Sequence, residues 1–293
     1  MDRRADRAPE AEAAASAGHA LARLLKNFSV EITSHDAEAA TGRLAPGAEV
    51  FVANPPKEGP DTLVAAAARL YRAGLVPVPH IVARKLRDAR ELDHLVGRLA
   101  GDAGVGRVLA LGGDRDSPVG AFDASLQLIE TGVFERHGVR QVSIACYPEG
   151  HPRIPDAVLQ SAHRANLAAV AERGIEARLV SQFGFAPEPV IAMARRLRAA
   201  GISAPLRIGV AGPAQRAKLV RYAMHCGVGA SLRALTGHRS LVGSLVAGET
   251  PEALLTAVAL AARDDPSLDI EGVHFFTFGA PEKSIVWAES RME

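Results

Sequence analysis

The feature that most limits the fold is a regular alternation of short apolar runs and longer helical segments. Eight runs rich in Val, Ile, Leu and Phe have the length of strands, and they occupy residues 28–33, 49–54, 76–82, 107–113, 141–147, 177–183, 206–212 and 273–278. Segments between them, such as "DTLVAAAARLYRAG" and "EPVIAMARRLRAAG", have helical periodicity and end in the glycine typical of a helix C-terminus. This alternation predicts parallel strands joined by crossover helices.

The number of units decides between the two common parallel architectures. Eight units in 293 residues fit a (β/α)8 TIM barrel better than an open Rossmann sheet, which has fewer strands and a reversal of strand order. We therefore predict the α/β class, with one barrel catalytic domain over residues 21–293. Residues 1–20 are expected to form a mobile tail that leads into an N-terminal helical extension. Residues 226–269 exceed the length of one crossover, and we expect an extra helix or loop there.

Composition excludes several classes of function. The chain has 34 Lys and Arg against 33 Asp and Glu, so its net charge gives no general attraction to nucleic acid or to an anionic membrane. No apolar run approaches the roughly 20 residues of a membrane helix, and the N-terminus has no signal-like apolar core. The two cysteines lack CxxC spacing. We expect a cytoplasmic protein with no disulfide framework and no metal site.

Polar side chains follow most of the predicted strands. They are Glu31, Asn54, His80, Asp114, Tyr147, Glu149, His151 and Gln182. In (β/α)8 barrels the active site lies at the carboxyl ends of the strands, whereas the interior is filled by apolar side chains. A polar ring at this many strand ends therefore favours a site over a purely structural role.

Each of these residues also has a structural interpretation. A buried Glu31 needs either a charged partner or a raised pKa, and a raised pKa would suit a general acid. Asp114 could cap the following helix, although several turn residues separate it from any helical pattern. Gln182 could bind the edge of a heterocycle or make a structural hydrogen bond.

The segment "YPEGHP" is unusual because it places an aromatic ring, a carboxylate and an imidazole between two prolines. Both prolines restrict the backbone, so the loop is expected to be rigid. A rigid loop with these side chains suits ligand binding better than simple connection. A zinc-binding role for His151 is disfavoured because no second His or Cys lies nearby at ligand spacing.

Taken in order, these motifs resemble the methylenetetrahydrofolate reductase family. The segments that carry the resemblance are "PH" at residues 79–80, "LGGD" at 111–114, "YPEGHP" at 147–152, "SQF" at 181–183 and "HFFTF" at 274–278. The similarity extends over residues 28–287. It implies a flavin-binding barrel that transfers a hydride from NADH or NADPH to FAD. The hydride then reduces 5,10-methylenetetrahydrofolate to 5-methyltetrahydrofolate, and the oxidative direction is an alternative.

The resemblance also implies roles for individual residues. Glu31 corresponds to the residue that protonates the folate so that its five-membered ring opens to an iminium. Asp114 corresponds to the carboxylate beside flavin and folate, and is the second predicted catalytic residue. Gln182 and Phe276 fall on the folate side. The FAD contacts implied by the motifs are Asn54, His80, Leu111, Gly113, Asp114, Ala124, Tyr147, His151 and Asn166.

The chain departs from the family pattern in three places. Gly112 replaces an Arg, no basic pair follows Asn166, and "FGAPEK" replaces Leu-Asn-Arg after the last strand. Two of these changes remove cations that would bind the phosphates of FAD. A flavin-independent reductase, or a folate-binding methyltransferase or carrier, therefore remains as an alternative. The expected partners are a folate and a nicotinamide dinucleotide, and we expect a homo-oligomer.

Overall fold

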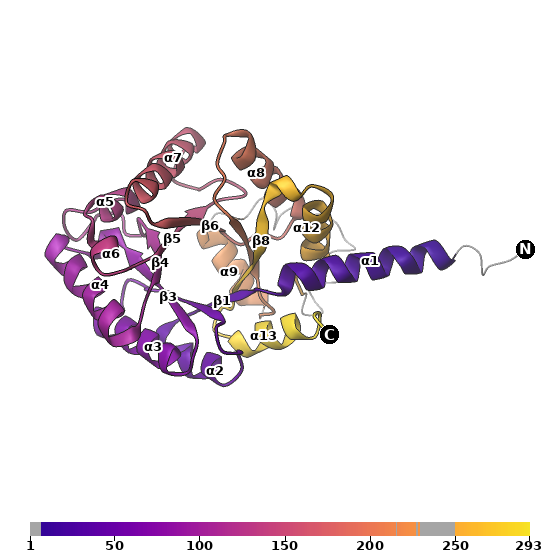
Figure 1. Ribbon diagram of the computed structural model, residues 1–293, viewed down its shortest axis with the longest axis horizontal. Helices are drawn as coiled ribbons and strands as arrows, with labels where there is room; N and C mark the ends of the chain where they lie inside the picture. Colours follow the sequence, from indigo (N-terminus) through magenta and orange to yellow (C-terminus); the bar gives the residue numbers. More distant parts are fainter. Residues whose placement is uncertain (1–6, 215, 227, 229–249) are drawn as a thin grey trace, which may run out of the picture.

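The computed structural model describes residues 7–214, 216–226, 228 and 250–293. It is a closed barrel of eight parallel strands in chain order, which confirms the predicted (β/α)8 fold (Figure 1). The strands are β1 Ser29–Ile32, β2 Glu49–Val52, β3 Val76–Val82, β4 Arg107–Leu111, β5 Gln141–Cys146, β6 Glu176–Ser181, β7 Leu206–Ala211 and β8 Ile270–Phe276. Each predicted strand is confirmed, with its ends shifted by three residues or fewer.

Helices cover the outside of the barrel. They are α1 Arg7–Leu25, α2 Ala37–Thr41, α3 Pro60–Arg72, α4 Ala89–Ala103, α5 Ser125–Glu130, α6 Val133–Arg136, α7 Asp156–Glu172, α8 Pro187–Ala199, α9 Arg216–Cys226, α12 Glu252–Asp264 and α13 Pro281–Glu289. Much of the extra segment expected within residues 226–269 lies outside the described residues.

Local sequence sets many of the helix ends. The side chain of Asp88 accepts a hydrogen bond from the backbone N–H of Glu91 at the start of α4, and Gly104 ends that helix in the left-handed conformation.

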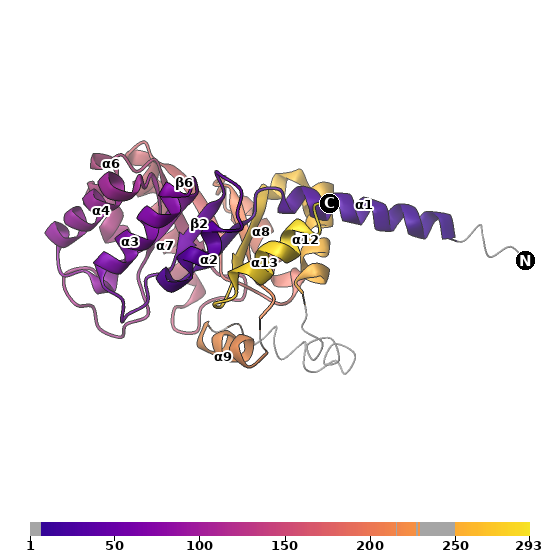
Figure 2. The ribbon, with the colours of Figure 1, turned by 90° about the horizontal axis from the view of Figure 1, so that it is seen from below.

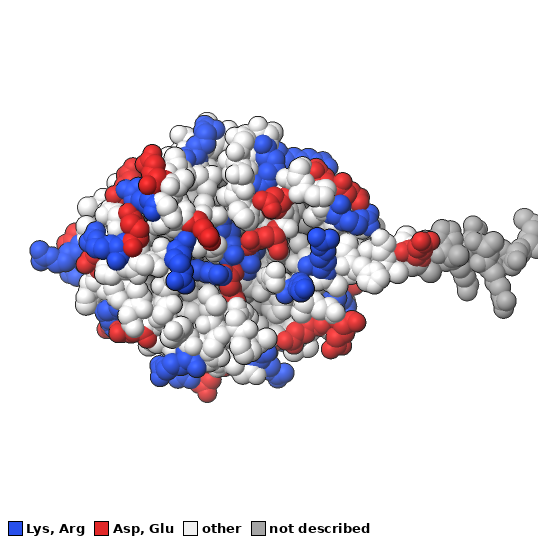
Figure 3. All heavy atoms as spheres, viewed as in Figure 1, with Lys and Arg blue, Asp and Glu red and all other residues white. Residues whose placement is uncertain are grey.

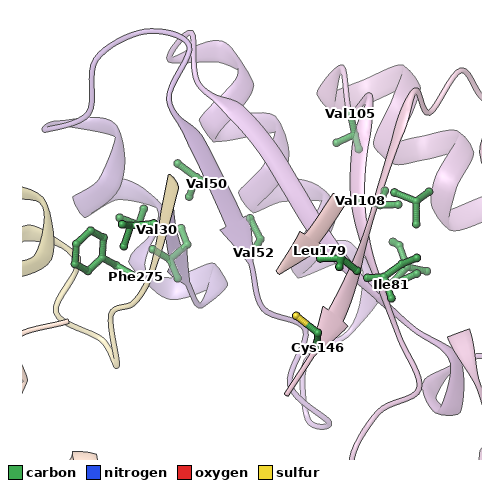
Figure 4. Close-up of a cluster of buried hydrophobic side chains, with 14 of the residues drawn as sticks. Val30, Val50, Val52, Ile81, Val105, Val108, Cys146, Leu179 and Phe275 are labelled. Carbon is green, nitrogen blue, oxygen red and sulfur yellow. The ribbon is translucent and has the colours of Figure 1, made fainter. Parts of the chain in front are cut away.

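The main core lies between the strands and these helices. Outward-facing side chains of the strands, including Val30, Val50, Ile81 and Phe275, are buried there (Figure 4). Burial of such side chains is the principal stabilising contribution to the fold. Among the described residues, no helix has the length and the apolar character needed to cross a bilayer.

The N-terminal helix α1 packs on α12 with its C-terminal part and extends away from the barrel with its other end (Figures 1 and 2). Leu21, Leu24 and Leu25 are buried at the packed end. Arg263 of α12 donates a hydrogen bond to Ser16 Oγ at 2.7 Å, on the solvent side of the same contact. The helical extension predicted before the barrel is therefore present.

The interior of the barrel differs from the sequence-based expectation of an apolar filling. At the amino-terminal ends of the strands, Glu49 forms ion pairs with Arg107, Arg178 and Arg207, while Glu271 pairs with Arg178 and Arg207. Acidic and basic side chains also lie together near the middle of the face seen in Figure 3.

An apolar layer follows this charged layer toward the other end of the barrel. It consists of Phe51, Val78, Leu109 and Val180. Phe51 of this layer packs edge-on against the rings of His80 and His274, which belong to the polar site.

Candidate active site

The site is built around Glu31, whose carboxylate points into the barrel from β1. Its Oε2 lies 3.4 Å from Nε2 of His80 on β3 and 3.5 Å from Nε2 of His274 on β8. Thr277 Oγ1 donates a 2.6 Å hydrogen bond to the backbone carbonyl of Glu31 and ties β1 to the end of β8. Three strands therefore hold the carboxylate between two imidazoles.

These neighbours determine the charge of Glu31. Burial alone would raise its pKa, but the charge of His80 and hydrogen bonding with His274 outweigh burial and lower the pKa to about 2. Of the two alternatives derived from the sequence, the charged partner is confirmed and the raised pKa is wrong. The sequence could not show this because both histidines are distant in the chain.

Sequence reasoning missed His274 as a site residue, although it lies in the quoted motif "HFFTF". Its side chain is fully buried, and its Nδ1 lies 2.9 Å from Ser29 Oγ. Its ring packs edge-on against Phe51 at 4.5 Å and Phe276 at 5.0 Å between centroids. The period-two pattern of a strand could have identified it, because His274 and Phe276 share one face of β8.

Both ends of the Asn54 side-chain amide make hydrogen bonds to neighbouring residues of the site. Its Nδ2 donates to the backbone carbonyl of His80 at 3.3 Å, and its side-chain oxygen accepts a hydrogen bond from Lys85 Nζ. Lys85 Nζ also donates to the carbonyls of Pro55 at 2.7 Å and Glu58 at 2.8 Å. Lys85, another residue that the sequence analysis missed, therefore stabilises the loop after β2.

Asp114, Tyr147 and His151 form a second group at the ends of β4 and β5. The rings of Tyr147 and His151 meet edge-on at 5.0 Å. Burial raises the pKa of Tyr147 to about 12, with a smaller contribution from Asp114. Burial and Arg153 lower the pKa of His151, and Asp114 opposes this change. The structure thus brings Asp114 close to the loop that carries Tyr147 and His151, which the sequence analysis proposed as a ligand-binding segment.

Cys226, at the end of α9, interacts electrostatically with a carboxylate from each of the two groups. Burial raises its pKa to about 11, and the charges of Asp114 and Glu31 contribute in the same direction. Both predicted catalytic carboxylates are therefore close enough to act electrostatically on one thiol. Glu31 lies near the carboxyl end of β1 and Asp114 follows the carboxyl end of β4, so both are on the same side of the parallel barrel.

Aromatic rings form the side of the mouth near β6 and β8. Phe276 lies 5.2 Å from Phe183 and is stacked on Phe278 at 6.4 Å between ring centroids. Gln182 Oε1 accepts a hydrogen bond from the backbone N–H of Phe183 at 3.0 Å. Within the described residues its NH2 group makes no hydrogen bond, so it remains available to a ligand. Phe278 has a positive φ of 50°, an unusual conformation for a side chain of this size.

Ala124 lies beside Gly112 at the end of β4, where a Cβ on that glycine would be 4.0 Å from the Cα of Ala124, whereas Asn166 lies on α7. Asn166 is buried on α7, where its Oδ1 accepts from Ser125 Oγ at 3.1 Å and its Nδ2 donates to the carbonyl of Ala162 at 2.7 Å. Ala124 precedes α5, and its N–H donates to Gln127 Oε1. These contacts link α5 to α7 and leave Asn166 with little capacity for a ligand.

Leu111 and Gly113 lie at the end of β4, next to Asp114. Gly113 has a φ of 106°, and a Cβ added there would lie 2.5 Å from Cγ1 of Val82. Only glycine therefore fits this close approach.

Two cavities lie near the residues attributed to FAD. One, of about 660 Å³, is lined by Asn54 and Lys85 together with side chains of α3 and α4, among them Arg98. The other, of about 440 Å³, lies between α5 and α7. Its lining consists of Leu126, Ala157, Val158, Ser161, Ala162 and Ala165.

Comparison with known proteins decides the family. Residues 56–230, more than half of the chain, match the sequence profile described as methylenetetrahydrofolate reductase. The chain belongs to the methylenetetrahydrofolate reductase family. Membership supports an oxidoreductase of folate one-carbon chemistry, and the matched residues contain every predicted site residue except Glu31, Asn54 and Phe276.

Solved structures with similar folds add no functional argument. A Yersinia pestis dihydropteroate synthase bound to a pterine-sulfa conjugate is 12% identical, with 92% of this chain and 94% of that chain covered and a TM-score of 0.48. The dihydropteroate synthase of Thermus thermophilus is 16% identical, with 90% and 92% covered and a TM-score of 0.46. A 2,3-dimethylmalate lyase is 11% identical, with 94% and 85% covered and a TM-score of 0.49.

The cavity between α5 and α7 fits the ring systems of FAD better than its diphosphate. The cavity between α5 and α7 is apolar apart from Ser161, which suits a flat heterocycle. No Lys or Arg lines it, and Leu167, Ala168 and Ala169 follow Asn166. No group of three or more His, Cys, Asp or Glu within the described part of the chain is placed to hold a metal ion.

Proposed function

We propose that this reductase-family member converts 5,10-methylenetetrahydrofolate to 5-methyltetrahydrofolate with NADH or NADPH as hydride donor and FAD as cofactor. The observation that supports this most strongly is the carboxylate of Glu31 between His80 and His274, on the same side of the parallel barrel as Asp114. FAD, when bound, would carry the hydride between the nicotinamide and the folate.

The protein's own residues would supply binding, orientation and proton transfer. Glu31 would deliver a proton to a nitrogen of the five-membered folate ring, which opens the ring to an electrophilic iminium. The NH2 group of Gln182 would bind the pterin edge, and the ring of Phe276 would pack against the folate. Asp114 would adjust the charge balance where cofactor and folate meet.

FAD, if bound, would be held mainly by apolar surface and by the β4 and β5 loops. Leu111, Gly113, Tyr147 and His151 would contact it at the mouth, and Ala124 would lie near the cavity between α5 and α7. Asn54 and His80 would contact it from β2 and β3. Asn166 would act indirectly, by fixing α5 on α7.

A flavin-independent reductase is the second candidate, in which the hydride passes directly from the nicotinamide to the folate. Two cations next to the β4 loop favour it, because they are engaged with backbone carbonyls. Arg84 donates to the carbonyls of Asp123 at 3.0 Å and Arg115 at 2.8 Å, and Arg153 donates to that of Asp114 at 3.3 Å. A diphosphate bound by Arg84 or Arg153 would therefore have to displace existing hydrogen bonds.

The first test is the visible spectrum of the purified protein, followed by anaerobic addition of NADH and then of methylenetetrahydrofolate. A bound flavin that bleaches with NADH and recovers with folate supports the FAD-dependent reaction. A colourless protein that oxidises NADH only when folate is present supports the second candidate. No NADH or NADPH oxidation with folate, with or without added FAD, contradicts both.

The contribution of Glu31 is tested by Glu31→Gln, with Glu38→Gln as a control because Glu38 pairs with Arg69 on the surface. We expect Glu31→Gln to lower folate reduction by about 10²–10⁴-fold, the usual contribution of a general acid, and to leave any flavin content unchanged. Full activity of Glu31→Gln would remove this residue from the mechanism.

The remaining proposals concern the localisation, the oligomeric state, the small-molecule partners and the direction of the reaction. We propose a cytoplasmic homo-oligomer that takes a folate and a nicotinamide dinucleotide as its small-molecule partners. The physiological direction, reduction or methyl oxidation, would follow from the relative rates measured with methylenetetrahydrofolate and methyltetrahydrofolate.

A further inference from the structure

The cavity between α3 and α4 adjoins the site, and the proposed function assigns no ligand to it. The two helices lie side by side on the outside of the barrel (Figures 1 and 2). Asn54 and Lys85, from the loops after β2 and β3, line the cavity together with side chains of α4. Asn54 Nδ2 donates to the carbonyl of His80, whose imidazole faces Glu31. The cavity therefore begins at the loop next to the proposed catalytic carboxylate.

The charge of this cavity differs from that of the cavity between α5 and α7. Its lining contains four Lys or Arg side chains and three carboxylates, whereas no Lys or Arg lines the other cavity. Each of the three carboxylates already has a partner. Asp61 pairs with Arg98 at 2.5 Å, and Glu91 pairs with Arg87 at 3.1 Å. Asp88 accepts a hydrogen bond from the backbone N–H of Glu91 at 2.9 Å. The lining as a whole carries one excess positive charge.

Arg90 is the lining cation that is free to bind a ligand. Lys85 already donates to the carbonyls of Pro55 at 2.7 Å and Glu58 at 2.8 Å. The Arg90 side chain is exposed, and within the described part of the chain it forms no ion pair or hydrogen bond. Because Asp88 already caps the first turn of α4, the guanidinium of Arg90 and not the helix end is the group that would bind an anion.

Arg90 belongs to a row of side chains on one face of α4. His94 and Arg98 follow it at intervals of four residues and also line the cavity, so the row is about 12 Å long. His94 is exposed and makes no hydrogen bond or ion pair with any other described residue. A row of this length suits an elongated ligand.

The size and the apolar lining indicate what the rest of such a ligand resembles. The cavity volume of about 660 Å³ lies within the roughly 300–1,000 Å³ of small-molecule sites. Its apolar lining consists of Pro60, Val82, Leu86 and Leu95. Apolar surface next to a free guanidinium suits a heterocycle joined to a phosphate group, because guanidinium binds phosphate with two parallel hydrogen bonds.

One phosphate-bearing group of the proposed reaction has no binding residues assigned to it. FAD is attributed to the loops after β4 and β5, and the folate to Gln182 and Phe276. The adenosine diphosphate half of NADH or NADPH is unassigned in both candidate reactions. A nicotinamide ring at the barrel mouth would direct this half outward, and Asn54 lies between the mouth and the cavity.

We propose that the cavity between α3 and α4 binds the adenosine diphosphate half of the nicotinamide dinucleotide. The diphosphate pairs with Arg90, and the adenosine lies against the apolar lining and the ring of His94. The inference rests on the proposed function, because that function requires the donor. It applies equally to the FAD-dependent and the flavin-independent reaction, since the same donor serves both.

The binding test uses adenosine diphosphate as the probe and isothermal titration calorimetry of the whole chain. It compares wild type with Arg90→Glu. The control is Arg195→Glu, because Arg195 is an exposed residue of α8 that lines neither cavity and forms no ion pair within the described residues. We expect Arg90→Glu to weaken binding by about tenfold or more, and Arg195→Glu to bind as wild type does.

Three results of this titration overturn the proposal. The first is equal affinity of wild type and Arg90→Glu, and the second is no binding of adenosine diphosphate to wild type at millimolar concentration. The third is binding of inorganic phosphate as tight as that of adenosine diphosphate, because the cavity would then bind a bare anion and not a nucleotide.

The activity test identifies the source of the adenosine diphosphate group. With NADH and methylenetetrahydrofolate, Arg90→Glu should raise the KM for NADH by about tenfold or more and change kcat less, because the contact is made before and during hydride transfer alike. A loss of FAD affinity with an unchanged KM for NADH overturns the assignment to the donor. If Arg90→Glu weakens adenosine diphosphate binding as expected but wild type reduces no folate with either donor, the proposed function has failed and the nucleotide site stands.

Discussion

Replacement of Glu49 tests the charged layer at the amino-terminal end of the barrel. The Glu49 side chain is 8% exposed, and its oxygens lie 2.7–2.8 Å from guanidinium nitrogens of Arg178 and Arg207, with Arg107 also in contact. In Glu49→Gln, Arg178 and Arg207 keep only Glu271 as an anionic partner, and Arg107 loses its ion pair with Glu49. Loss of one partner from a buried ion pair costs about 3–5 kcal/mol.

The pKa of Glu49 gives an independent estimate of the same quantity. Burial raises its pKa, but the charges of Arg207 and Arg178 outweigh burial and lower it from 4.5 to about 2. That difference corresponds to about 3 kcal/mol of folding free energy at neutral pH. Because the folded-state pKa lies below the unfolded one, this stability is present above about pH 4.5 and is lost as pH falls toward 2.

Urea unfolding followed by circular dichroism measures the effect at pH 7 and pH 3. We expect Glu49→Gln to lower the free energy of unfolding at pH 7 by about 3 kcal/mol, and the difference from wild type to shrink to roughly half at pH 3. The control is Glu252→Gln, since Glu252 forms a half-exposed pair with Arg291 that contributes about 0–1 kcal/mol. The reasoning is refuted if the two variants differ by less than about 1 kcal/mol at pH 7.

Three further substitutions test backbone geometry and the site. Gly209→Ala should unfold at a much lower temperature than Gly42→Ala in a thermal melt, because its Cβ would lie 2.1 Å from the carbonyl of Ser181 whereas Gly42 has nothing within 4 Å. Equal melting temperatures would contradict this packing. Gly101→Ala, in the interior of α4 with open space around it, should raise the free energy of unfolding by about 0.5–1 kcal/mol; a loss of stability would contradict this expectation. Asp114→Asn should change the rates of both cofactor reduction and folate reduction in rapid-mixing kinetics, and unchanged rates would leave Asp114 with a loop-stabilising role.

Much of the fold could be predicted because its signals are local. Residues 76–82 alternate with helical segments and coincide with β3, since strand length, apolar content and following turn residues act over a few positions. The start of α4 at Asp88 and its end at Gly104 depend on side-chain and backbone properties of single residues. The family resemblance added the expected roles of the strand-end residues.

The charge state of Glu31 could not be predicted from the residues near it in the sequence. Glu31 and His274 are 243 positions apart, and they meet only because β1 pairs with β8 and closes the barrel. Before closure, burial is the only property of Glu31 that its neighbours in sequence indicate, and burial alone favours a raised pKa. Closure adds two imidazoles within 3.5 Å and reverses the sign of the shift.

The sequence by itself determined the eight strands, the helical segments between them and the set of polar residues at the strand ends. Only the tertiary structure decided which of these residues share an environment, including the charged layer around Glu49 and the pairing of Asn166 with Ser125. The physical reason is the separation along the chain over which each kind of interaction acts. Backbone preferences and periodicity act within one segment, whereas ion pairs, desolvation and proton positions depend on groups that approach one another only when the whole barrel has closed.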